Sequence, residues 1–268
     1  MSLPEPDRTP LIAPPLLVTL CQVRYDARDD LASAALGKIL LKHLASLGLG
    51  SMTQIRQQQV VLISGAAAEH LSQEAPPQPA GWQFTNETGT TTVNVLTDQM
   101  TLETRIYPGW DAFLATWTQC INALANAALP TLSTRLGLRY VNRITSRQAR
   151  TAKDFRRADL VDPTFLGPIE ESSLSEYVTQ TEGRATLKFP DGTESLVQHG
   201  VVTENSAPAF VLDIDCFRSE AVEFDRTSLP DAASLLNERA LQIFQTVVRP
   251  ALQEEMKQGG SGLWPSRT

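Results

Sequence analysis

The stretch LGLRYVNRIT, residues 136–145, is typical of a β-strand and follows a long helical segment, PGWDAFLATWTQCINALANAALP at 108–130. On a strand, side chains two residues apart share a face. Arg139 and Arg143 should therefore point to one side, and Tyr140 and Asn142 to the other. A comparable strand, LLVTLCQVRY at 16–25, opens the ordered part of the chain. Residues 136–145 therefore mark the start of a second unit of the same kind.

Both units have the same predicted order of elements, β-α-β-β-β-β-α. In the first unit, a helix with leucines at helical spacing follows the opening strand and ends at Gly48 and Gly50. The four strands that come next are QQQVVLIS, GWQFTNE, TTTVNVLT and QMTLETRIY. In the second unit they are SLSEYVTQTE, RATLKFP, TESLVQHGVVTE and AFVLDIDCF. One long helix over 228–256, with a Ser228 cap and Pro230 in its first turn, completes this unit.

This order predicts an α+β fold of two pseudo-repeated β-α-β4-α units, with an antiparallel sheet and the helices packed on one face. The predicted boundaries are an extended tail at 1–13, a first unit at 14–134, a second at 135–256 and a flexible tail at 257–268. The alternative is a single α+β domain whose strands alternate in this way by chance. The element order resembles the saddle fold of the TATA-binding protein and, less closely, a helix-grip fold.

Composition excludes several classes of function. The 268 residues carry a formal net charge of −7, so we expect no dedicated nucleic-acid partner, because such proteins show a basic excess. The three cysteines are far apart and form no CxxC pair, which indicates buried free thiols in a reducing compartment. No basic region precedes an apolar N-terminal stretch, and no apolar window is long enough to span a bilayer. We therefore expect a cytoplasmic protein without membrane association.

Catalytic and cofactor motifs are missing from the sequence. It contains no GxSxG, no GxxxxGK[ST], no GxGxxG and no HExxH. We therefore expect no cofactor and name no catalytic residue, and the balance favours a protein that is not an enzyme.

Arginines provide the strongest candidate for ligand binding. A basic cluster between residues 135 and 157 comprises Arg135, Arg139, Arg143, Arg147, Arg150, Lys153, Arg156 and Arg157. Arg24, Arg139 and Arg143 could share one sheet face and grip a phosphate or carboxylate, since a guanidinium binds both through two hydrogen bonds. The alternative is structural: these arginines pair with acids of the sheet, Asp213 and Asp215 above all. The same two aspartates are weak candidates for a metal site, which would need a third ligand from elsewhere.

A second set of residues carries a resemblance to a known family. Tyr107, Trp110 and Phe113 form the pattern Y-x2-W-x2-F, and GLRYVNRI contains Tyr140 and Asn142. Through these motifs the chain, from about residue 14 to 256, resembles a sporadically distributed family of bacterial proteins of similar length. That family has no established activity, so the resemblance supports the fold, and its patchy distribution implies mobile or defence-associated genes.

We expect a structural role for this second set. An Asn on the core side of a strand must satisfy its amide, so Asn142 is predicted to hydrogen-bond a loop backbone and hold the two halves in register. Trp110 and Phe113 lie on one apolar helix stripe and are predicted to be core residues.

Three classes of function remain. The leading hypothesis is a non-catalytic binding or interaction protein of a bacterial defence or mobile-element system, which holds a protein partner on its exposed sheet face or in a groove between the halves. A homodimer is compatible with this hypothesis. The first alternative is a binder of a small anion or of nucleic-acid phosphates through the arginine-bearing face. The second alternative is a metal-dependent hydrolase or nuclease built on Asp213 and Asp215.

Overall fold

The computed structural model describes residues 3, 5–57, 78–145, 151–155, 159–171, 173–204 and 207–259. In the first half of the chain these form β1 (Leu16–Tyr25), α1 (Ala34–Leu44), β2 (Ser51–Gln57), β3 (Gln78–Thr85), β4 (Thr91–Leu96), β5 (Gln99–Thr104) and α2 (Trp110–Ala127). In the second half they form β6 (Leu132–Thr145), α4 (Pro168–Glu171), β7 (Gly183–Lys188), β8 (Glu194–Glu204), β9 (Ala207–Arg218), β10 (Val222–Glu223), α5 (Leu229–Val247) and α6 (Pro250–Lys257). Across the described residues, no helix is both long and apolar enough to cross a bilayer.

All ten strands belong to one antiparallel sheet, in the order β2-β3-β4-β5-β1-β6-β9-β8-β7, with β10 paired to β6. The α+β class and the antiparallel sheet are therefore confirmed. The opening strands of the two halves, β1 and β6, pair with each other at the centre, where Cys21 faces Leu138. The remaining strands of each half extend outward from this centre to the two edges, β2 and β7.

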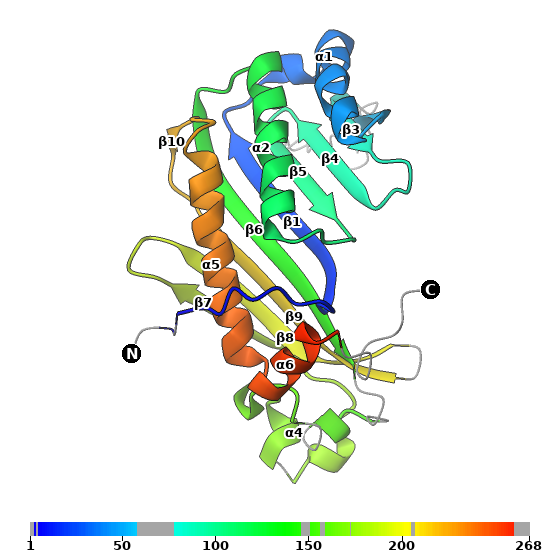
Figure 1. Cartoon of the computed structure of the whole chain (residues 1–268), viewed down its shortest axis with the longest axis vertical. Coiled ribbons are helices and arrows are strands. Elements are labelled where there is room, and N and C mark those ends of the chain that lie inside the picture. The colour runs from blue at the N-terminus through cyan, green and yellow to red at the C-terminus, as the bar shows by residue number, and fades with distance from the viewer. Residues whose placement is uncertain are drawn as a thin grey trace, which may run out of the picture.

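Helices cover one face of the sheet (Figure 1). α1 lies over β3 and beside α2, and α5 packs against β6 and β9. Strand alternation explains why this face is the core, since every second residue is buried, as in the run of Phe210, Leu212 and Ile214 along β9. On α2, Phe113 and Trp117 are buried as the helical spacing predicts. The opposite face of the sheet has no helix over it among the described residues.

Two predicted elements of the second half were wrong. The segment SLSEYVTQTE is not a strand: it holds a short 3-10 turn at Ser175–Tyr177, and Tyr177 is 81 % exposed. Of its apolar residues, Leu174 is 61 % exposed and Val178 is only partly buried against the core, so the segment does not form a core strand. The unit continues with β7, β8, β9 and the two-residue β10. The predicted helix over 228–256 is two helices, because the residue before a proline is disfavoured in the helical region and Arg249, before Pro250, is extended.

Smaller differences concern helix starts and the first half. Ser228 makes no side-chain cap to α5; instead, Asp225 accepts hydrogen bonds from the backbone of Thr227 and Ser228. Strand β2 ends at Gln57, where the predicted strand QQQVVLIS begins, and the rest of that stretch lies outside the described residues. The N-terminal segment is held on α5, where Arg8 pairs with Glu238 at 2.7 Å.

Candidate functional site: the open face of the sheet

The candidate site lies on the helix-free face, where β1, β6 and β9 run side by side. The alternation expected along β6 is confirmed: Tyr140 and Asn142 are buried on the helix side, whereas Arg139 and Arg143 are half-buried on the other. In the β6–β9 register, Val141 lies opposite Asp213 and Arg139 opposite Asp215. This arrangement brings arginines of one strand next to aspartates of the other.

Two diagonal ion pairs occupy the centre of this open face. Arg139 donates from Nε to Oδ1 of Asp213 at 2.7 Å and from Nη2 to the other carboxylate oxygen. Arg135 donates from Nη2 to Oδ2 of Asp215 at 2.9 Å. The hydrogen bond to Asp213 raises the pKa of Arg139. Burial raises the pKa of Asp215, and the positive charges of Arg135 and Arg139 oppose that rise.

Arg135 is the residue around which the site is organised. Its guanidinium carbon lies 4.7 Å from the centre of the Phe217 ring, within cation–π range. It also lies over Gly137, where a Cβ atom would come within 2.3 Å of Nη1. Gln22 on β1 accepts hydrogen bonds at 3.3 Å from both Arg135 and Arg24. Gly137 therefore provides the space that lets Arg135 lie flat and connect three strands.

The three arginines predicted to grip an anion do not come together. Arg24 lies opposite Arg135 in the β1–β6 register, and Arg143 is eight positions further along β6, on the order of 27 Å away at the rise of an extended strand. The physical reason is the antiparallel pairing of the two opening strands. Arg24, near the end of β1, lies beside the start of β6, whereas Arg143 lies near the end of β6. At its own end of β6, Arg143 donates its backbone N–H to the carbonyl of Pro15.

The weak metal candidates have another role in this geometry. Asp213 and Asp215 do share a face, but each carboxylate is held by an arginine. Among the described residues, no group of three His, Cys, Asp or Glu side chains gathers closely enough to hold a metal ion. Arg147, Arg150, Arg156 and Arg157 of the basic cluster lie outside the described residues.

The residues that carry the family resemblance lie on the helix side of the sheet. Tyr107, Trp110, Phe113 and Tyr140 form one aromatic chain with ring centroids about 6 Å apart. The Tyr140 hydroxyl donates to Asn237 of α5 at 2.8 Å and lies 3.4 Å from the Tyr107 hydroxyl. Burial raises the pKa of Tyr107 to about 12. These contacts join the start of α2, the central strand β6 and α5.

Asn142 was predicted to hydrogen-bond a loop backbone, and this prediction was wrong, because its partners belong to strands. It is 2 % exposed, and its amide donates to the backbone carbonyl of Leu212 on β9 at 3.1 Å and of Tyr140 at 3.5 Å. It stands where the β1–β6 register shifts between Leu16 and Val18. Its contacts thus reinforce the pairing of β6 with β9 beside this irregularity.

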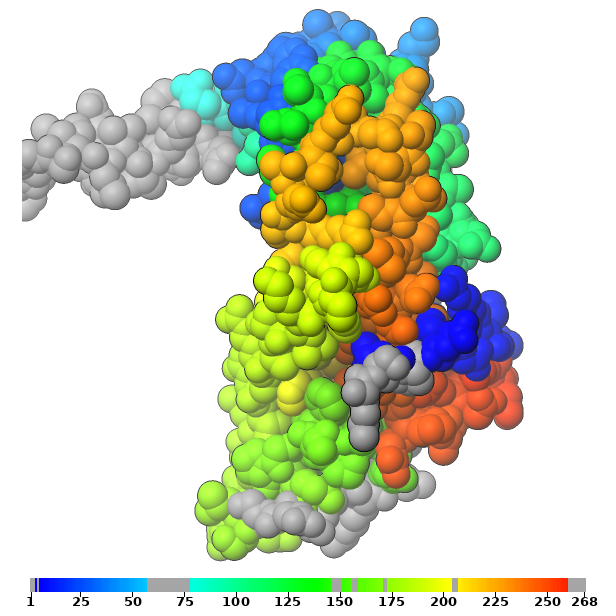
Figure 2. Space-filling view, turned by 90° about the vertical axis from the view of Figure 1, so that its left-hand side faces the viewer, coloured from blue at the N-terminus to red at the C-terminus, as the bar shows by residue number. Residues whose placement is uncertain are grey.

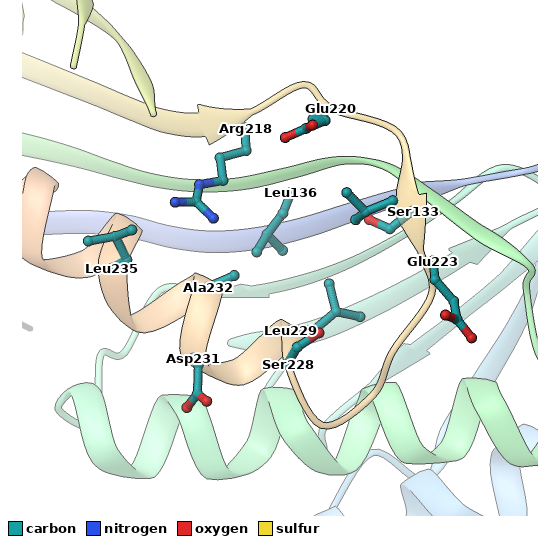
Figure 3. Close-up of a pocket in the computed structure, with 11 residues that line it drawn as sticks. Ser133, Leu136, Arg218, Glu220, Glu223, Ser228, Leu229, Asp231, Ala232 and Leu235 are labelled. Atoms are coloured by element: carbon teal, nitrogen blue, oxygen red, sulfur yellow. The ribbon is translucent and has the colours of Figure 1, made fainter. Parts of the chain in front are cut away.

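A cavity of about 390 Å³ lies on the helix side, between the first turns of α5 and the ends of β6 and β9 (Figure 3). Leu136 and Leu229 face each other across it, and Arg218 borders it on the β9 side. The Asp231 carboxylate points away from Leu136. None of the residues predicted to bind a ligand lines this cavity, and the sheet separates it from the ion pairs.

Arg135 and Gln22 are the site residues that the sequence interpretation did not select. The spacing of Arg135, Arg139 and Arg143, four residues apart, was the available signal, because such residues share one strand face. No signal marked Gln22, since its contact depends on which strand lies beside β6.

Comparisons with known proteins leave this site without an assigned function. No family model matches the chain, and no curated protein matches its sequence. Among solved structures, the di-domain ARO/CYC StfQ from the steffimycin biosynthetic pathway is 9 % identical, with 92 % of this chain and 97 % of that chain covered and a TM-score of 0.15. A likeness at that score carries no argument about this protein.

Proposed function

We propose that the chain is a non-catalytic binding protein that docks a partner protein on the open face of its sheet. The observation that carries the proposal is that two ion pairs, Arg139–Asp213 and Arg135–Asp215, lie at the centre of that face. Around them lie half-buried apolar side chains: Val18, Leu20, Val141, Val211 and Phe217. A protein partner could cover this apolar area without leaving a buried charge unpaired, since both arginines already have carboxylate partners.

The charge arrangement favours a protein over a polyanion. A phosphate backbone is bound by arginines whose charge is available to it. Here Arg135 and Arg139 each have an aspartate at hydrogen-bond distance, and a phosphate would have to displace it. Arg24 and Arg143 lie at opposite ends of the β1–β6 ladder. A small anion could therefore not meet all three predicted arginines at once.

The proposed evolutionary origin is an internal duplication that produced a saddle-like sheet. Its support is the mirrored strand order, β2-β3-β4-β5-β1 in the first half and β7-β8-β9-β6 in the second. A cytoplasmic location and a place in a bacterial defence or mobile-element system remain predictions that rest on composition and on the family resemblance.

The experiment that tests this function is a capture from cells that carry the native gene, run with and without nuclease. Leu20→Arg places a charge at the centre of the open face, and Ile39→Arg places the same charge on the exposed side of α1. We expect the wild type and Ile39→Arg to retain one stoichiometric protein that Leu20→Arg loses, with circular dichroism showing that all three are folded. Retention of nucleic acid, an empty wild type, or capture that Leu20→Arg leaves unchanged would overturn the proposal.

A further inference from the structure

β7 forms one edge of the ten-stranded sheet. It pairs with β8 without a register shift, and no other described strand pairs with it. Figure 2 faces this edge, and the yellow-green surface of this part of the chain is exposed there. Along β7, exposed and half-buried residues alternate, with Arg184, Thr186 and Lys188 exposed. A regular edge of this kind exposes backbone groups that can pair with another strand.

The hydrogen bonds on either side of β7 show which backbone groups point outward. Thr181 donates its N–H to the carbonyl of Val201 at 2.9 Å, and Phe189 donates to Thr193 at 2.8 Å. In an antiparallel ladder, residues that bond to the neighbouring strand alternate with residues that do not. The odd-numbered residues of β7 therefore bond to β8. Arg184, Thr186 and Lys188 direct their N–H and C=O groups away from the sheet.

The side chains of the same residues give this edge a positive charge. Arg184 and Lys188 lie two positions on either side of the midpoint, Thr186. Lys188 is 3.8 Å from Glu194 on β8, and this pair is largely exposed to solvent. If a second copy paired with β7 about Thr186, Arg184 of each copy would lie opposite Lys188 of the other. Like charges directly opposite on paired strands are destabilising, so the edge does not suit a second copy.

We propose that an extended, acidic segment of a partner protein binds to β7 as an additional antiparallel strand. The outward N–H and C=O groups of three residues supply the backbone hydrogen bonds, and Arg184 and Lys188 select acidic residues at alternate positions. Arg184 and Lys188 project from the same helix-free face as Asp213 and Phe217, but β8 separates this edge from the ion pairs on β6 and β9. The proposal does not depend on the function proposed above.

The test measures fluorescence anisotropy with two labelled peptides, one alternating Glu and Val, the other alternating Lys and Val. We expect the full chain to bind the acidic peptide at least about tenfold more tightly, a difference of 1.4 kcal/mol. Thr186→Pro removes an outward N–H but no hydrogen bond to β8, since edge strands accept proline where the N–H faces solvent. It should weaken binding about tenfold, through the lost bond and the ring's bulk. Thr186→Val keeps the N–H and should bind as the wild type does.

Charge reversal gives a second variant that stays informative even if Thr186→Pro does not fold. Arg184→Glu combined with Lys188→Glu should reverse the preference between the two peptides. The control, Arg56→Glu, reverses one exposed charge on β2 at the opposite edge and should change neither affinity. Failure of the acidic peptide to bind, or equal binding by the charge-reversed variant and the wild type, would overturn the proposal.

Discussion

Replacing Asn142 by aspartate should test whether its amide stabilises the centre of the sheet. The side chain is 2 % exposed and donates to two backbone carbonyls, those of Leu212 and Tyr140. Asn142→Asp keeps the shape but puts a carboxylate, which can only accept, against two acceptors. Burial and the facing carbonyl dipoles should raise the pKa of the introduced carboxyl by about three units above its unfolded value of about 3.9.

The magnitude follows from that shift. Three units correspond to about 4 kcal/mol of lost stability once the pH exceeds the pKa of the folded state. The sign is fixed by linkage: a raised pKa means that the folded state holds the proton longer, so the loss is small below about pH 4 and grows as the pH rises. Near pH 5, about one unit above the unfolded pKa, the loss is about 1.5 kcal/mol.

The assay is urea unfolding of Asn142→Asp and of the wild type at about pH 5 and pH 8, followed by tryptophan fluorescence, since Trp82 and Trp117 are buried. The difference between the two proteins at each pH removes the titration of all other groups. Asn142→Leu, which cannot ionise, is the control and should show the same loss at both values. A variant within about 1 kcal/mol of the wild type at pH 8, or an equal loss at both pH values, would refute the reasoning.

Three further predictions concern packing, pH and thiol access. Gly200→Ala places a Cβ 2.0 Å from the Thr181 carbonyl oxygen and should cost at least about 2 kcal/mol in urea unfolding, whereas Gly50→Ala meets no atom within 4 Å and should be nearly neutral. Burial lowers the pKa of His199 below 6.5, so the folded state favours the neutral ring. Stability should therefore fall as the pH drops through 6.5, and His199→Gln should lose less over that range. The three buried cysteines should react with a thiol reagent only in urea, because burial raises their pKa values; reaction in native buffer would contradict the described core.

Local patterns predicted much of the fold and little of the site. The β9 segment AFVLDIDCF alternates with the period of a strand, and the α2 stripe through Phe113 and Trp117 has the period of a helix, so both elements were recognisable. SLSEYVTQTE was mistaken for a strand because its composition suits one. Whether such a segment pairs depends on a neighbour that the local pattern does not specify.

The sequence by itself determined the fold class, the face that each β6 side chain takes and the excess of acidic residues. Each of these follows from neighbouring residues, through strand alternation, helical spacing and charge. The tertiary structure alone decided that β1 pairs with β6, which separates Arg24 from Arg143, and that β9 lies on the other side of β6, which pairs Arg139 with Asp213. Contacts between strands depend on order and register, and these are set by the burial of the whole helix-covered face.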